Sequence, residues 1–181
     1  NPYANSKIAA ENVIRDSGIN HTIFRFFNLA GADPDGEMGE DHEPETHMIP
    51  LLFENLNNFI INGDDYETKD GTCIRDYVHV SDVAEAHLLA MDYLNTWKTG
   101  QSAVVNLGTG VGYSNLEIVN LVKDILGIDI QYQFGPRRQG DPSRLVANIE
   151  SAKSLLDFKP KYDISDILET AYSWYTRNEY R

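Results

Sequence analysis

The stretch VVNLGTGVGYSNLEIVNLVKDIL at residues 104–126 predicts the fold class of this chain. Residues 104–107 form a short apolar run, which is typical of a buried strand, and a glycine-rich turn follows it. Ser114 and Glu117 have the spacing of a capping box, which predicts a helix over residues 116–126. A buried strand that leads through a tight turn into a capped helix is typical of α/β proteins, so we expect further strands to alternate with helices.

The rest of the chain continues this alternation. Further helices are predicted over residues 3–17, ended by Gly18, over 48–58, over 81–94, capped by Ser81, and near the carboxyl end, where Ile164, Ile167, Leu168, Ala171 and Tyr175 share one face. Strands are predicted over residues 21–27, 77–80 and 130–134, and long polar loops over 28–46 and 63–71. The fold class is therefore α/β.

Composition excludes several classes of function. The 181 residues suffice for one ordinary domain, and 15 Lys+Arg against 28 Asp+Glu leave a net charge of -13, which disfavours general nucleic-acid binding. We see no apolar run of membrane-spanning length and no secretory signal, so we expect a cytoplasmic protein without a membrane partner. Cys73 is the single cysteine, and no Cys/His spacing resembles a zinc site, so no metal is expected.

Tyr3 and Lys7 are the first candidates for chemistry. They are four residues apart at the start of a predicted helix and therefore lie on one face of it. A nearby ammonium stabilises a phenolate by charge attraction, and a phenolate is a general base. The alternative is an ordinary surface pair on an amphipathic helix, which spacing alone leaves open.

Two glycine-containing turns are candidate anion sites. The turn Gly108-Thr109-Gly110-Val111-Gly112 follows a strand as a dinucleotide-binding turn would, but the third glycine of that fingerprint is replaced by Tyr113, so we favour a tight structural turn. In the loop 135–141, Arg138 and its neighbour Arg137 could bind phosphate, and Asp141 could accept from ribose hydroxyls. A solvated turn held by surface ion pairs is the alternative.

The segment 64–80 is dense in acidic residues, but their spacing does not fit a calcium loop. Arg75 lies between an apolar residue and an acid, so it is either a phosphate ligand or a partner in a structural ion pair. His79 and Cys73 are interpreted as packing or hydrogen-bonding residues rather than catalysts.

A series of motifs in one order is more specific than any of them alone. They are Tyr3-x-x-x-Lys7, Arg25-Phe26-Phe27-Asn28, Gly31-Ala32, Gly39-Glu40-Asp41, the run 63–80, Asn106-Leu107-Gly108-Thr109-Gly110 and Arg137-Arg138-x-Gly140-Asp141. This series resembles the carboxyl-terminal portion of the UDP-glucose 4-epimerase family, within the extended short-chain dehydrogenase/reductases. The resemblance covers essentially the whole chain, and residues 64–80 are its most specific part.

The resemblance implies roles for residues at the cofactor and the sugar. Tyr3 is expected to be the catalytic base, and Lys7 to bind the nicotinamide ribose of NAD and favour the phenolate. Phe27 is expected to border the nicotinamide, and Asn28 to hydrogen-bond the diphosphate or the sugar of a UDP-sugar substrate.

The resemblance also implies which residues bind the rest of the substrate. His47 and Met48 are expected at the start of a uracil-facing helix, where His47 departs from the family's usual Asn. Arg75 and Arg138 are expected to bind the diphosphate, and Asp141 the uridine ribose. Leu145 is expected to size the pocket around the C2 substituent of the sugar, which leaves open whether an N-acetyl group fits.

The family pattern implies a division of the chain and a reaction. Residues 1–28 and 76–110 are expected to belong to an NAD-binding Rossmann domain whose glycine-rich part is absent, and 29–75 and 111–181 to a smaller UDP-sugar-binding domain. The implied reaction is interconversion of UDP-glucose and UDP-galactose in galactose metabolism, through a 4-keto sugar.

The full-length protein is expected to be a homodimer, and the fragment alone is expected to be inactive. There are three alternatives: a 4-epimerase acting on UDP-N-acetylhexosamine or UDP-glucuronate, a non-catalytic nucleotide-binding relative, and a mere folding fragment.

Overall fold

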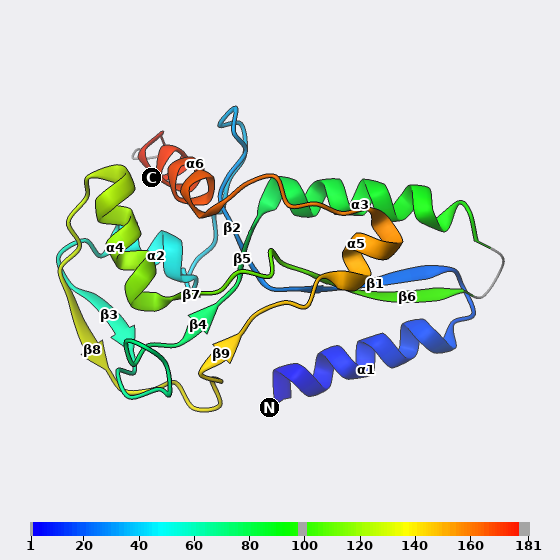
Figure 1. The fold of residues 1–181 in the computed structure, drawn as a ribbon, viewed down its shortest axis with the longest axis horizontal. Helices are drawn as coiled ribbons and strands as arrows, with labels where there is room; N and C mark the ends of the chain where they lie inside the picture. Colours follow the sequence, from blue (N-terminus) through cyan, green and yellow to red (C-terminus); the bar gives the residue numbers. More distant parts are fainter. Residues whose placement is uncertain (1, 98–100, 178–181) are drawn as a thin grey trace.

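Helices and strands alternate along most of the chain in the computed structural model, which describes residues 2–97 and 101–177 (Figure 1). The helices are α1 (Pro2–Asp16), α2 (Met48–Glu54), α3 (Val80–Leu94), α4 (Asn115–Leu126), α5 (Glu150–Leu156) and α6 (Ile164–Arg177). The strands are β1 (His21–Phe26), β2 (Asn28–Ala30), β3 (Phe59–Asn62), β4 (Ile74–Arg75), β5 (Tyr77–His79), β6 (Ser102–Leu107), β7 (Tyr113–Ser114), β8 (Tyr132–Gly135) and β9 (Arg144–Leu145). The predicted α/β class is confirmed.

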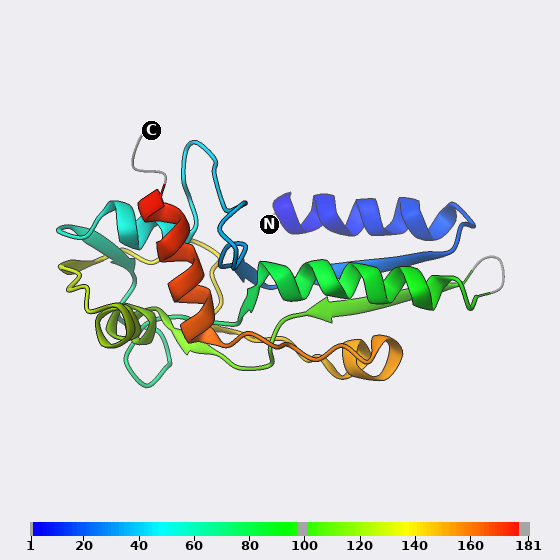
Figure 2. The same cartoon turned by 90° about the horizontal axis from the view of Figure 1, so that it is seen from above.

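One half of the molecule is built on the parallel pair β1 and β6, which run in register from His21 opposite Ser102 to Phe26 opposite Leu107. Figures 1 and 2 show α1 and α3 running along this pair, and α5 packs against β6 and α3. The apolar core of this half includes Val78, Val105 and Leu107. No residue of α1 is buried, so this helix adds nothing to that core.

The other half is built on α2, α4 and α6 and on the parallel pair β3 and β8. Its core includes Ile49, Ile118 and Ile167, one from each of the three helices. The short mixed sheet β7-β4-β9 and the parallel pair β2-β5 lie where the two halves meet (Figure 1). Because chain segments cross here several times, side chains far apart in the sequence converge at this junction.

The division predicted from the family pattern stays a prediction. Within it, residues 147–158 were assigned to the sugar-binding part, yet Ala147, Ala152 and Phe158 pack into the core of the β1–β6 half. The chain therefore returns to the first half near its carboxyl end before α6 joins the second.

Several predicted boundaries were wrong. The helix expected over 48–58 ends at Glu54, because Asn55 and Asn58 form a turn through a backbone hydrogen bond and Phe59–Asn62 then pairs with β8. Asparagine is a poor helix former, which favours an early end. The helix α5 and the short strands β2, β3, β4, β7 and β9 were not predicted at all, and β2 lies within the segment predicted as a loop over 28–46.

The cap of α3 was also assigned to the wrong residue. His79, not Ser81, is the N-cap, and its Nδ1 accepts a hydrogen bond of 3.1 Å from the backbone N–H of Ser81. The His79 ring is fully buried, stacks on Tyr162 at 4.1 Å and has Nε2 3.1 Å from Thr170 Oγ1. Protonation of Nδ1 would remove the acceptor, so this geometry requires the neutral imidazole.

This cap predicts a loss of stability on mild acidification. Burial lowers the pKa of His79 from its usual value of 6.5, so below that pH the unfolded chain binds the proton before the folded one does. The free energy of unfolding should therefore be highest above about pH 6.5 and fall as the pH drops through the folded pKa. Urea denaturation between pH 8 and 5 measures this, and His79→Asn should show a smaller decline than the wild type. His87→Asn, which removes an exposed imidazole, is the control and should decline as the wild type does. An equal decline of the wild type and His79→Asn would assign the acid sensitivity to other groups.

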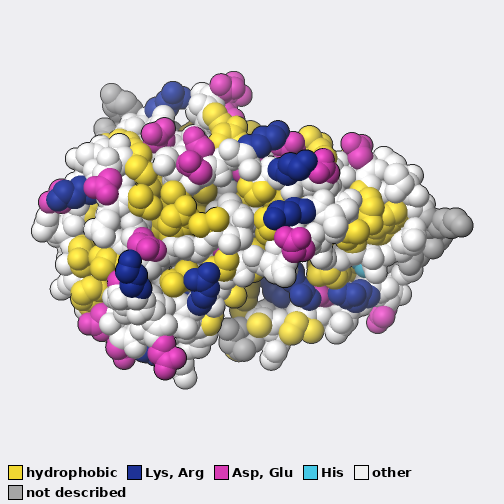
Figure 3. Space-filling model, in the orientation of Figure 1, with side chains coloured by type: hydrophobic (Ala, Val, Ile, Leu, Met, Phe, Trp, Pro, Cys, Tyr) yellow, Lys and Arg dark blue, Asp and Glu magenta, His cyan; other side chains and the backbone are white. Residues whose placement is uncertain are grey.

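The face of the molecule shown in Figure 3 is not broadly basic, because acidic and basic side chains are interspersed on it over both halves. No helix among the described residues is long and apolar enough to cross a bilayer. In a chain with a net charge of -13, an anionic ligand is favoured where a few cations converge locally.

Candidate functional site

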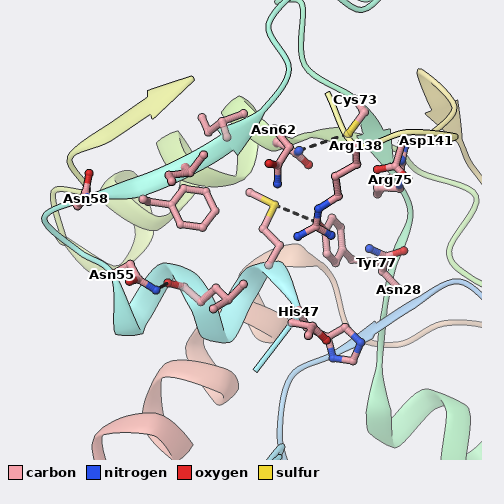
Figure 4. A pocket seen from close by; sticks show the side chains of 17 residues that line it. Asn28, His47, Asn55, Asn58, Asn62, Cys73, Arg75, Tyr77, Arg138 and Asp141 are labelled. Carbon is pink, nitrogen blue, oxygen red and sulfur yellow. Dashed lines mark hydrogen bonds and ion pairs between the residues drawn. The ribbon is translucent and has the colours of Figure 1, made fainter. Parts of the chain in front are cut away.

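A cavity of ≈ 440 Å³ lies in the second half, close to the junction of the two halves. Its walls come from α2, β3, β4, β5 and α4 and from the loop that follows β8, and Figure 4 shows their side chains converging. The volume falls within the range that small-molecule sites occupy. Six of the residues singled out from the sequence line it: Asn28, His47, Met48, Arg75, Arg138 and Asp141.

Arg75 is held in one orientation within this cavity. Its side chain is only 11% exposed, and its Nη1 donates hydrogen bonds of 2.9 Å to the carbonyl oxygens of Ile74 and Pro142. Its Nη2 lies 3.3 Å from Asp141 Oδ2. The two interpretations of Arg75 are thus compatible, because it has an acidic partner and also faces the cavity.

The two adjacent arginines of the loop after β8 have different surroundings. Arg138 lines the cavity (Figure 4). Arg137 lies over the ring of Tyr66, 4.2 Å from its centroid, and forms an ion pair with Asp65. The loop therefore contributes one guanidinium to the cavity and uses the other for a structural contact.

Sequence reasoning missed a group of carboxamides in the cavity wall. Besides Asn28, the lining includes four further asparagines: Asn55, Asn58, Asn62 and Asn115. Carboxamides both donate and accept hydrogen bonds, which suits the edge of a planar polar ring. The run of asparagines at 55–58 could have been noticed as polar residues in an otherwise apolar segment.

Tyr77 and Cys73 also line the cavity but are not bases. Burial raises the pKa of Tyr77 far above its usual value, so this phenol stays protonated, and its hydroxyl donates to Met48 Sδ at 3.4 Å. Cys73 is buried, and its Sγ accepts a hydrogen bond of 3.3 Å from Asn115 Nδ2. The packing role expected for Cys73 agrees with these contacts.

A second cavity of ≈ 290 Å³ adjoins the first. The two share Asn28, His47, Met48 and Tyr77 in their walls, and Phe27 lines the second one. Phe27 therefore lies on the β1 side of the shared wall. A ligand that filled both spaces would extend from the arginines toward the first half of the molecule.

Tyr3, Lys7 and Leu145 line neither cavity. Tyr3 is 71% exposed, and Lys7 Nζ lies 5.2 Å from the centroid of its ring, so the two do share one face of α1. In Figures 1 and 2 the N-terminal end of α1 points toward the junction of the halves. Leu145 is 46% exposed on β9, where it pairs with Arg75 across the strand register.

The turn after β6 is closed by a carboxylate. Asp76 is fully buried and accepts hydrogen bonds from the backbone N–H groups of Thr109, Gly110 and Ala147 and from the hydroxyl of Thr109, at 2.7 to 3.0 Å. These N–H groups are the ones that a pyrophosphate would need. The interpretation of Gly108-Thr109-Gly110 as a structural turn is therefore confirmed.

Comparison with known proteins identifies relatives of this chain. A model of the NAD dependent epimerase/dehydratase family matches residues 1–108. A curated UDP-glucose 4-epimerase of Lactobacillus helveticus is 47% identical over 97% of this chain and 55% of its own length. The chain spans about half the length of the curated relatives it matches.

Solved structures agree. A UDP-glucose 4-epimerase from Stenotrophomonas maltophila with bound NAD and formylated UDP-arabinopyranose superimposes with a TM-score of 0.91 at 31% identity, over 99% of this chain and 56% of that one. The enzyme from Bifidobacterium longum in complex with NAD+ and UDP gives a TM-score of 0.89 at 34% identity, over 98% of this chain and 55% of that one.

Proposed function

The chain belongs to the NAD dependent epimerase/dehydratase family, and from this premise we propose that the protein interconverts UDP-glucose and UDP-galactose with NAD as cofactor. The observation that carries the proposal is the single cavity into which Arg75, Arg138 and Asp141 converge from β4 and the loop after β8. Two guanidinium groups in one cavity of a chain with a net charge of -13 form a selective site for a diphosphate.

The cavity walls suit the parts of a nucleotide diphosphate sugar. Arg75 and Arg138 bind the diphosphate, and Asp141 accepts from the ribose hydroxyls while it also orients Arg75. His47 and Met48, at the start of α2, face the uracil side. Asn28 lies in both cavities and hydrogen-bonds where the diphosphate continues into the sugar.

The residues present fit the nicotinamide end of NAD. Tyr3 and Lys7 lie on one face of α1 with the ammonium 5.2 Å from the phenol ring centroid, and Phe27 lines the space next to the substrate cavity. The turn at Gly108 does not hold the pyrophosphate, since Asp76 already occupies its N–H groups. NAD supplies the reversible hydride acceptor that an inversion at carbon requires.

The proposed reaction needs a base that moves the proton and a site that holds the nucleotide. Tyr3 takes the proton from the sugar C4 hydroxyl and later returns it, and the Lys7 ammonium lies beside it on the same face of α1. Arg75, Arg138 and Asp141 keep the UDP portion in place while the 4-keto sugar turns over. Because the nucleotide is bound firmly and the hexose makes only loose contacts, the 4-keto sugar can be reduced on either face, which gives both epimers.

An epimerase for UDP-N-acetylhexosamine or UDP-glucuronate is the second candidate. The observation that favours it is Leu145, the residue expected to size the pocket around the C2 substituent, which is 46% exposed on β9 and lines neither cavity. Assays of these sugars beside UDP-galactose separate the two candidates.

The experiment that tests the proposed function is conversion of UDP-galactose to UDP-glucose by the whole protein in the presence of NAD. Turnover of UDP-galactose supports the proposal. Binding of UDP without turnover of any UDP-hexose would favour a non-catalytic nucleotide-binding protein. A cytoplasmic location, a homodimer and the inactivity of the present chain alone stay predictions.

Arg138 should matter more for diphosphate binding than its neighbour. Arg138→Gln removes a cation that lines the cavity, so we expect the Kd for UDP to rise about 10- to 100-fold, with little change for uridine. Arg137→Gln is the matched control, because its guanidinium contacts Asp65 and Tyr66 instead. Calorimetric titration measures both, and equal losses in the two variants would contradict the assignment.

A further inference from the structure

Four potential metal ligands converge in the loop between β2 and α2. Glu40, His42, Glu45 and His47 each offer one ligand atom, and these atoms all lie within 4.8 Å of one another. We propose that this loop binds one divalent transition-metal ion of the Zn²⁺ type. The proposal does not rest on the epimerase activity, because it concerns a cation and residues of one loop.

The distances are close to those of a metal site. With Zn–N and Zn–O bonds of 2.0–2.2 Å, neighbouring ligand atoms of a tetrahedral site lie about 3.4 Å apart. Only one ring nitrogen of His42 can bind the ion: Nδ1, which is 3.6 Å from Glu40 Oε1, or Nε2, which is 3.4 Å from Glu45 Oε1. His47 Nδ1 is 4.0 Å from Glu45 Oε1 and in direct contact with Glu40. Binding therefore requires side-chain rotations that bring the four ligand atoms, now within 4.8 Å of one another, to this spacing around one ion.

The charges of the loop favour a cation. Glu45 is only 9% exposed at its side chain and Glu40 26%, and Glu45 Oε1 also accepts hydrogen bonds from the backbone N–H groups of Thr46 and His47. Among the described residues, the ion-pair partners of both are His42 and His47 alone, and residues 26–68 contain no Lys or Arg. The two carboxylates lie beside two imidazoles, and a bound divalent ion would compensate the carboxylate charges.

The ligand types select the class of metal. Two imidazoles with two carboxylates suit Zn²⁺ and similar transition ions, whereas Ca²⁺ and Mg²⁺ prefer oxygen ligands throughout. No metal was expected from the sequence, because its Cys/His spacing does not resemble a zinc site. Here half of the ligands are glutamates, and the loop must fold back before they meet.

The loop is anchored from outside the cluster, which reduces the entropy lost on binding. The backbone carbonyl of Glu40 accepts a 2.9 Å hydrogen bond from Trp174 Nε1 on α6. At its other end the loop runs directly into α2, because His47 is the N-cap residue of that helix. A bound ion would therefore tie α6 to the start of α2 at the wall of the nucleotide cavity.

Titration of chelator-treated whole protein with Zn²⁺ tests the proposal. We expect one equivalent to bind, and Co²⁺ in its place to give the intense visible absorption of a tetrahedral site. Loss of an outer-shell partner alone lowers metal affinity about 10- to 100-fold, so His42→Gln and Glu40→Gln should each weaken binding by at least about 100-fold. Far-UV circular dichroism of each variant without metal checks that the fold is intact.

Two variants serve as matched controls. Glu43→Gln removes a negative charge from the same loop, and His87→Gln removes an exposed imidazole from α3, so both should bind Zn²⁺ as the wild type does. No stoichiometric binding by the wild type would overturn the proposal and leave a cluster of histidine–glutamate ion pairs. Equal weakening in the controls would also overturn it, since binding would then follow general surface charge.

Discussion

Replacement of Tyr3 by Phe should lower kcat for UDP-galactose epimerisation by roughly 10²- to 10⁴-fold and leave the Kd for UDP within about twofold. The change removes one hydroxyl oxygen, and with it the group that takes the sugar proton. Because Tyr3 lines neither cavity, the sites of Arg75 and Arg138 keep their geometry. Steady-state kinetics and UDP titration of the same preparation separate the two effects.

Tyr132→Phe provides the control for this substitution. Tyr132 is an exposed tyrosine on β8, outside both cavities, and the change again removes only a hydroxyl. It should keep wild-type kcat. If Tyr3→Phe turned over at the wild-type rate, the proton would have to leave through another group, and the assignment of the base would fail while the proposed function survived.

Replacement of Asp76 by Ala should destabilise the protein by about 4 kcal/mol or more. The carboxylate is fully buried and accepts four hydrogen bonds, three of them from backbone N–H groups. Alanine would leave these donors buried without acceptors, and each such donor costs about 1–3 kcal/mol. Urea denaturation at neutral pH measures the free energy of unfolding.

A milder variant at the same place calibrates the result. Thr109→Ala removes one of the four hydrogen bonds to Asp76 and the 3.2 Å hydrogen bond that the Val111 N–H donates to Thr109 Oγ1, but the three backbone donors to Asp76 stay satisfied, so we expect a loss of about 1–2 kcal/mol. Equal stabilities of Asp76→Ala and Thr109→Ala would show that water replaces the carboxylate. In that case the turn after β6 would not depend on Asp76.

Local signals in the sequence predicted the longer helices and strands well. The capping box of Ser114 and Glu117 is present with both of its hydrogen bonds, and α1 ends just before Gly18, which has a positive φ of 72°. These features depend on residues within one turn of each other. A sequence therefore contains nearly all the information that they require.

Elements held by distant partners were the ones missed. The strand β9 has only two residues and exists because it pairs with β4, about 70 positions earlier in the chain. The helix α5 is seven residues long and packs on β6 and α3. Short elements have little intrinsic preference of their own, so their tertiary contacts decide them.

In the candidate site, too, residue types could be predicted from the sequence, whereas the placement of side chains depended on tertiary contacts. Residue types alone predicted that Arg75 and Arg138 could bind an anion, because a guanidinium matches phosphate wherever it lies, and that Asp141 could accept hydrogen bonds from ribose hydroxyls. Of the two adjacent arginines, only Arg138 lines the cavity. Tyr66 and Asp65 hold the Arg137 side chain elsewhere.

The sequence by itself determined the α/β class, the main helices and the chemical types available for binding and catalysis, because these follow from local periodicity, capping and side-chain chemistry. Folding alone brings asparagines from β3, from α4 and from the turn after α2 into one wall with the arginines, and fills the turn at Gly108 with Asp76 rather than a ligand. The physical reason is that hydrogen bonds and cavities form between atoms close in space. Pairs such as Asp76 and Ala147, 71 residues apart, meet only when the chain has folded.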